Sequence, residues 1–137
     1  MHGARPRTGT RLDGARILVV DDEADARELF SSILEGSGAQ VITAGSAEEA
    51  MVALRATRID LLVSDIEMPG EDGYSLLQRA MSERNGDPLV AIAVTAYARP
   101  ADRRRALDAG FKSHLAKPVE PSELVSTIAS ALSTTAY

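Results

Sequence analysis

Short apolar runs alternate with amphipathic stretches along the chain. Five runs stand out in the sequence, at residues 16–20, 40–44, 61–64, 89–94 and 113–116. They are nearly continuous in apolar character, which is typical of parallel strands that are buried on both faces. We therefore expect five strands, each followed by a helical stretch.

The first two helical stretches have clear start and stop signals. After residue 20, apolar residues recur at intervals of three and four until Gly36, which is typical of an amphipathic helix. The residues in this stripe are Ala26, Leu29, Phe30, Ile33 and Leu34. After residue 44, Ser46 and Glu49 have the spacing of a capping box, so we expect a second helix to begin there.

Three more helices are predicted in the second half of the chain. The third contains Tyr74, Leu77 and Met81, and the fourth spans residues 101–109 before Gly110. The fifth begins at Pro121, a residue that is favoured in the first turn of a helix. Its expected buried residues are Leu124, Val125, Ile128 and Leu132.

Strands that alternate with helices predict an α/β fold with a single doubly wound five-stranded parallel sheet. Parallel strands need crossover connections, and right-handed crossovers place helices on both faces of the sheet. We expect this domain to span residues 15–133, with a flexible basic tail or linker at 1–14 and a short tail at 134–137. Ligands of such folds bind at the carboxyl ends of the strands.

Composition narrows the range of functions. The chain has 137 residues, no cysteine and a net charge of −5, so disulfides and thiolate metal sites are excluded. The negative charge disfavours sequence-independent binding to nucleic acid. No apolar run approaches the ~18 residues that a bilayer span needs. We therefore expect a cytoplasmic protein that binds neither nucleic acid nor membrane.

Polar side chains follow four of the five predicted strands. Asp21 and Asp22 follow the first, Asp65 the third, Thr95 the fourth and Lys117 the fifth. Two carboxylates about 4 Å apart repel by roughly 4 kcal/mol at an effective dielectric constant near 20, so a cation is needed. Oxygen ligands beside a phosphoryl group suit Mg²⁺. The set predicts a phosphoryl-transfer site with an aspartate as the acceptor.

Each of these residues also has an ordinary explanation when it is considered alone. Adjacent aspartates favour a helix start, and an aspartate before Pro and Gly is typical of a turn. Thr95 suits a strand, and Lys117 suits a solvated surface. However, the chain contains 13 arginines and only two lysines, so a lysine after the fifth run indicates a specific need for a point charge.

The order and spacing of these residues resemble the receiver domain of bacterial two-component response regulators. The resemblance extends from Arg16 to Leu132. It implies a flavodoxin-like sheet with strand order 2-1-3-4-5. It also implies that Asp65 accepts a phosphoryl group from a phosphohistidine, and that Lys117 pairs with Asp65 at rest. The Lys117–Pro118 peptide bond is expected to be cis.

The resemblance also implies how Mg²⁺ is bound. Asp22 and Asp65 would contact the ion through their side chains, Glu67 through its backbone carbonyl, and Asp21 mainly through water. Thr95 and Lys117 would contact the phosphoryl oxygens.

Three residues depart from the usual pattern of the family. Glu67 adds a carboxylate at the rim, where it would hinder or orient a hydrolytic water, and Tyr97 would shield the same approach. His114 stands where the family usually has a Tyr or Phe that acts with Thr95 as a switch. In the family, as the resemblance implies, the ring at this position turns inward when the threonine moves toward the phosphoryl group. The imidazole of His114 can gain a charge, so we expect its protonation to favour the outward, solvated position.

Function is expected to be that of a signalling switch and not of a turnover enzyme. The implied partners are a histidine kinase or histidine phosphotransfer domain, with readout by another protein or by a receiver homodimer. The start of the domain also resembles the join to the C-terminal receiver of a hybrid sensor kinase. The main alternative is a Mg²⁺-dependent phosphatase resembling haloacid dehalogenases, although the expected D-x-D after the first strand is missing. A flavin or nucleotide binder would need a glycine-rich phosphate loop.

Overall fold

The computed structural model describes residues 11–85 and 87–134. Within these residues, strands and helices alternate in the following order: β1 (Arg16–Val20), α1 (Ala24–Gly36), β2 (Gln40–Ala44), α2 (Ala47–Ala56), β3 (Leu61–Asp65), α3 (Gly73–Glu83), β4 (Val90–Thr95), α4 (Pro100–Ala109), β5 (Ser113–Ala116) and α5 (Pro121–Thr134). All neighbouring strands pair in parallel, in the order β2-β1-β3-β4-β5. The predicted fold class and strand order are confirmed.

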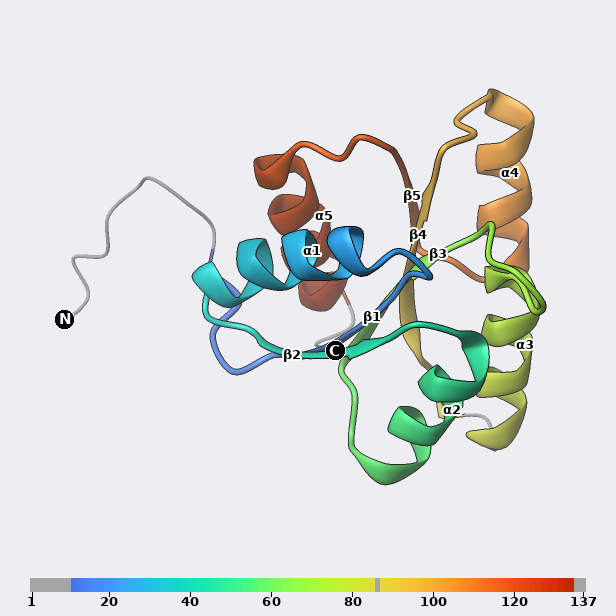
Figure 1. Cartoon of the computed structure of the whole chain (residues 1–137), viewed down its shortest axis with the longest axis horizontal. Coiled ribbons are helices and arrows are strands. Elements are labelled where there is room, and N and C mark those ends of the chain that lie inside the picture. Colours follow the sequence, from blue (N-terminus) through green and yellow to red (C-terminus); the bar gives the residue numbers. More distant parts are fainter. Residues whose placement is uncertain (1–10, 86, 135–137) are drawn as a thin grey trace, which may run out of the picture.

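Two layers of helices cover the sheet. α1 and α5 lie on one face, and α2, α3 and α4 lie on the other (Figure 1). In β1, Ile17 and Val19 belong to the core under α1 and α5, whereas Leu18 and Val20 belong to the core on the opposite face. Successive side chains of a strand point to opposite faces, so one nearly continuous apolar run supplies both cores.

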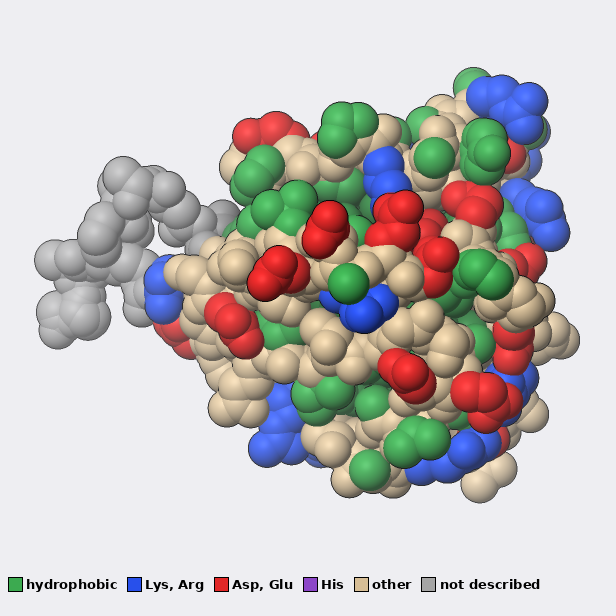
Figure 2. Space-filling model, viewed as in Figure 1, with side chains coloured by type: hydrophobic (Ala, Val, Ile, Leu, Met, Phe, Trp, Pro, Cys, Tyr) green, Lys and Arg blue, Asp and Glu red, His purple; other side chains and the backbone are tan. Residues whose placement is uncertain are grey.

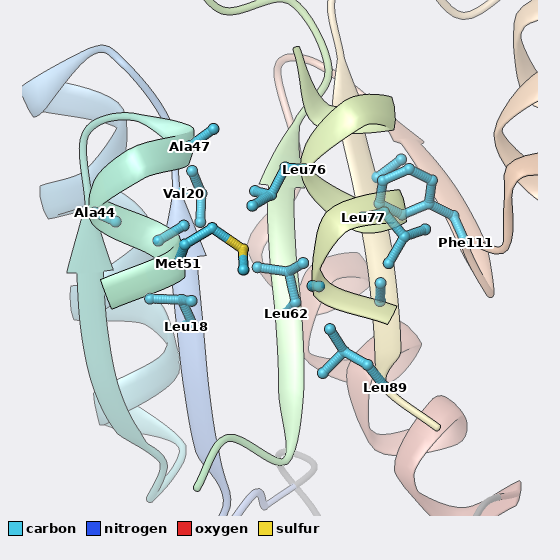
Figure 3. Packing of buried hydrophobic residues seen from close by; sticks show 14 of the residues in the cluster. Leu18, Val20, Ala44, Ala47, Met51, Leu62, Leu76, Leu77, Leu89 and Phe111 are labelled. Carbon is cyan, nitrogen blue, oxygen red and sulfur yellow. The ribbon is translucent and has the colours of Figure 1, made fainter. Parts of the chain in front are cut away.

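The core under α2, α3 and α4 is closely packed. Met51 of α2 points toward Leu62 of β3, and Leu76 of α3 lies beside this pair (Figure 3). None of these three side chains is more than 1% exposed. Each fully buried residue of this kind stabilises the fold by roughly 1.5–3 kcal/mol. This rigid core supports the strand ends at which the polar residues lie.

One residue that was predicted to lie on the buried face of α1 is exposed in the structure. Phe30 and Leu34 are buried, but Leu29 is 55% exposed. Leu29 lies at the edge of the apolar stripe, and the helix turns the side that carries Phe30 and Leu34 toward the sheet. In the same way, Met81 of α3 is 38% exposed. Periodicity located both helices but placed the edges of their buried faces too far out.

The predicted capping box at the start of α2 is half correct. The Ser46 hydroxyl accepts a hydrogen bond from the Glu49 backbone N–H at 3.2 Å, which confirms Ser46 as the N-cap. The Glu49 carboxylate does not return to Ser46. It accepts instead from the Gly45 N–H at 2.7 Å, one residue earlier. The loop before α2 is therefore fixed from both ends.

The folded part of the chain begins earlier than residue 15. Leu12 is 4% exposed and belongs to the core under α1 and α5. Its N–H donates to Ser37 O at 2.6 Å, and Gly14 N–H donates to Gly38 O at 3.2 Å. A single apolar residue in a polar stretch has no periodic signal, so the pattern of apolar residues predicts a start of the domain that lies a few residues too late. Residues 1–10 and 135–137 of the predicted tails lie outside the described residues.

No helix in the described ranges combines the length and the apolar character that are needed to cross a bilayer.

Candidate functional site

The predicted polar residues meet at one edge of the sheet. Asp21 follows β1, Asp65 and Thr95 end β3 and β4, and Lys117 follows β5, so parallel pairing brings all four to the same edge. Asp21, Asp65 and Thr95 are 1%, 5% and 2% exposed. Acidic side chains gather on the surface at this edge, between α1 and α4 (Figure 2). Buried polar side chains need hydrogen-bond partners and are rarely found together without a specific role. This group of them marks the edge as the candidate site.

One part of the site, which we call the lysine side, consists of Asp21, Asp65 and Lys117. The Lys117 ammonium donates to Asp65 Oδ2 at 3.2 Å, as the resemblance implies, and also to Asp21 Oδ2 at 3.0 Å, which was not expected. The Lys117–Pro118 peptide bond is cis, as expected. One cation therefore bridges two buried carboxylates.

Charges on the lysine side are not balanced. Burial raises the pKa of Asp65 to about 6, and the negative charges of Asp21 and Glu67 act in the same direction, while Lys117 partly offsets them. Burial lowers the pKa of Lys117, but its hydrogen bond to Asp21 and the negative charge of Asp65 outweigh this effect, so the net pKa is raised. The site therefore has room for a further positive charge.

The acidic residues of this edge fit a divalent cation. Asp21, Asp22 and Asp65 can each offer one carboxylate oxygen, and these oxygens lie within 4.8 Å of one another. Asp22 is exposed, so the ion could keep part of its water shell. Hard oxygen ligands with retained water are the preference of Mg²⁺. The role of the Glu67 backbone carbonyl as a further ligand stays a prediction.

The other part of the site, which we call the threonine side, consists of Thr95, Glu67 and Tyr97. The Thr95 hydroxyl contacts both carboxylate oxygens of Glu67, at 2.7 and 2.9 Å, and its oxygen accepts from the Tyr97 N–H at 3.0 Å. The sequence predicted a role for the backbone carbonyl of Glu67, but it gave no reason to expect this contact of its side chain.

A pocket of about 430 Å³ lies beside the threonine side, and Thr95, Tyr74, Arg105 and His114 contribute to its lining. The Arg105 guanidinium lies over the Tyr74 ring at 4.2 Å from its centre. His114 Nε2 is buried and has no hydrogen-bond partner among the described residues. The ring thus already has one nitrogen shielded from water, and its role as a switch stays a prediction.

Two residues that sequence analysis missed position the aspartates. The Gly73 N–H donates to Ile66 O at 2.8 Å, and a Cβ at this position would lie only 2.4 Å from Asp65 O. Glycine therefore permits the close approach of α3 to the end of β3. Arg27 of α1 donates to Asp21 O at 2.7 Å. The glycine at a helix start was a usable signal, whereas Arg27 looked like any arginine on a helix surface.

Comparisons with known proteins agree with this geometry. Residues 17–129 match the response regulator receiver domain. An uncharacterized 14.6 kDa protein in the sodA1 3′ region of Leptolyngbya boryana is 49% identical over 80% of this chain and 83% of its own length. The sensor histidine kinase GacS of Pseudomonas protegens is 33% identical over 82% of this chain, which spans only 13% of that kinase.

A solved structure shares both the fold and part of the sequence. The CheY-like response regulator receiver domain protein from Methanospirillum hungatei JF-1 aligns with a TM-score of 0.80 and 32% identity, over 89% of this chain and 96% of that protein. The match to the receiver domain covers most of the chain and contains every residue of the lysine side and the threonine side. The chain therefore belongs to the family of response regulator receiver domains.

Proposed function

We propose that this receiver is a phosphorylation-dependent switch in which Asp65 accepts a phosphoryl group from a phosphohistidine of a histidine kinase or a histidine phosphotransfer domain. The similarity to part of a sensor histidine kinase supports this class of partner. A second protein, or a second copy of the receiver as a homodimer, would then read the modified state.

The observation that carries the proposal is the setting of Asp65. Its Oδ2 accepts from Lys117, whereas its Oδ1 has no hydrogen bond from any described residue. A lone pair of the carboxylate would attack phosphorus, and the P–N bond to the histidine would break with its electron pair returning to the imidazole. The product is an aspartyl phosphate, whose added charge Lys117 can contact without a large movement.

The three aspartates would hold Mg²⁺. Asp22 and Asp65 are proposed as direct ligands, with Glu67 O as a third and Asp21 acting mainly through water. When bound, Mg²⁺ supplies charge neutralisation at the phosphoryl oxygens. Lys117 keeps Asp21 and Asp65 close together, so the chain itself orients two of the carboxylates before any ion binds.

The phosphatase alternative has less support. The family match favours a receiver over an enzyme resembling haloacid dehalogenases. No pair of acidic residues follows Asp65 on a later strand among the described residues. Steady release of phosphate from a generic phosphomonoester would favour the alternative.

The test is phosphorylation by a small phosphodonor. The wild-type chain should gain one phosphoryl group from acetyl phosphate with Mg²⁺, as measured by intact mass, and should gain none with a chelator. Asp65→Asn should abolish the gain, whereas Asp108→Asn, which changes an exposed aspartate of α4, should leave it unchanged. Undiminished labelling of Asp65→Asn would place the acceptor at another residue.

A further inference from the structure

The Thr95 hydroxyl has only one proton, and Glu67 already uses it. A hydroxyl offers one donor and two acceptor lone pairs. Here the proton points to the Glu67 carboxylate at 2.7 and 2.9 Å, and one lone pair accepts from the Tyr97 N–H at 3.0 Å. Thr95 therefore has no proton to give to another acceptor while it contacts Glu67.

The two partners differ in their freedom to move. Thr95 is 2% exposed at the end of β4, with its backbone paired to β5, so it stays within the site. Glu67 belongs to the loop between β3 and α3 and is exposed. Its carboxylate can turn into water without leaving a buried charge unpaired. Separation of the pair is therefore a movement of Glu67 or a change of rotamer at Thr95.

We propose that the Glu67 carboxylate competes with the phosphoryl group on Asp65 for the single proton of Thr95, so that phosphorylation must break the Glu67–Thr95 contact before the switch can form. This inference rests on the proposed function and adds to it a residue that regulates the same site. The Glu67 carboxylate and the phosphoryl group would both need the Thr95 hydroxyl as a donor. The free energy of the Glu67–Thr95 contact is therefore subtracted from the free energy that phosphorylation supplies for switching.

Tyr97 would change its position or contacts when the Thr95 hydroxyl changes its acceptor from Glu67 to the phosphoryl group. Its backbone N–H contacts the same hydroxyl, so rotation of Thr95 removes this contact or moves the loop between β4 and α4. The Tyr97 side chain is 58% exposed at the rim of the pocket, which leaves it free to follow. A change at Thr95 is thus passed to a surface that a partner can contact.

The loop should keep its shape without the Glu67 side chain. The Gly73 N–H donates to Ile66 O, and the Asp72 carboxylate caps α3 by accepting from the Ser75 N–H at 2.9 Å. Neither bond involves Glu67. A change at residue 67 should therefore test the contact and not the fold.

The experiment measures the affinity for beryllium fluoride, a phosphoryl mimic, in the presence of Mg²⁺. Isothermal titration would compare the wild type, Glu67→Ala, Thr95→Val and the double variant. Loss of a hydrogen bond to a charged acceptor should tighten binding of the mimic to Glu67→Ala by about tenfold. In the Thr95→Val background the same change should tighten binding much less, because only repulsion between anions is then removed.

Controls separate the contact from simple charge. Glu67→Gln removes the charge but keeps an acceptor oxygen, so its affinity should lie between those of the wild type and Glu67→Ala. If Thr95→Val does not fold, Thr95→Ala takes its place in the cycle. Equal tightening by Glu67→Ala in both backgrounds would overturn the competition. Failure of the wild type to bind the mimic would instead overturn the proposed function itself.

Discussion

The lysine side and the threonine side hold their polar groups in opposite ways. On the lysine side, Lys117 contacts Asp21 and Asp65, the residues next to which a phosphoryl group would form. On the threonine side, Thr95 is turned to Glu67, a residue of the neighbouring loop. Under the proposed function, the lysine side is arranged for the reaction before phosphorylation, whereas the threonine side would have to rearrange. The two sides would then serve different steps, acceptance of the phosphoryl group and the response to it.

The largest change in stability should come from removing Lys117, the cation of the lysine side. Lys117→Ala leaves Asp21 and Asp65 buried and unbalanced, and should lower the free energy of unfolding by about 3 kcal/mol at pH 7 in chelator. Urea unfolding measures this loss.

Mg²⁺ should restore part of that stability because it replaces the missing positive charge. The matched control is Lys112→Ala, which changes the other lysine of the chain, an exposed residue. Equal losses in the two variants would show that Lys117 does not balance the aspartates.

A smaller effect should follow from the charge of Asp65. Its pKa is about 6 in the folded chain and 3.8 as the ordinary value, so between these pH values the folded state binds more protons than the unfolded state. The favourable contribution is full below pH 3.8 and is lost as the pH rises through about 6. At pH 7.5 in chelator, Asp65→Asn should therefore be more stable than the wild type by on the order of 2 kcal/mol.

The pH dependence of that difference distinguishes charge from packing. The advantage of Asp65→Asn should shrink steadily when urea unfolding is repeated down to pH 4.5, because the wild-type carboxyl becomes neutral. A difference that does not change with pH would mean that burial does not raise the pKa of Asp65.

The smallest effect should come from a substitution at Gly73, the first residue of α3 after the turn that follows Asp65 and contains Glu67. In Gly73→Ala the new Cβ would meet Asp65 O at 2.4 Å, so the start of α3 must shift. We expect a loss of about 1 kcal/mol in unfolding free energy and a slower phosphorylation of Asp65, since its backbone moves with the turn. Gly36→Ala is the control because a Cβ there would meet nothing within 4 Å. A fully active Gly73→Ala would show that the close approach has no role in the site.

The lysine side was predictable because it depends on residues at strand ends. Buried parallel strands have a strong apolar signal, and their order along the chain places Asp21, Asp65 and Lys117 at one edge. The threonine side was only half predictable. The position of Thr95 follows from β4, but the direction of its hydroxyl depends on where a loop side chain, Glu67, turns in space. No sequence period describes that direction.

The burial of Leu12 and the exposure of Leu29 differ from the prediction because they also depend on contacts between distant parts of the chain. Leu12 is buried by contacts with residues far along the chain, and Leu29 is exposed by the rotation of α1 against the sheet. In both cases tertiary packing, and not the local pattern of apolar residues, decides whether the side chain is buried.

The position of the phosphoryl group on the chain decides whether Asp65 is the acceptor. Borohydride reduces an acyl phosphate to the alcohol, so an aspartyl phosphate becomes homoserine. After reaction with acetyl phosphate and Mg²⁺, reduction and proteolysis, tandem mass spectrometry should find homoserine at position 65 alone. Homoserine at position 21 or 22, or no homoserine in a chain that has gained a phosphoryl group, would mean that Asp65 is not the acceptor.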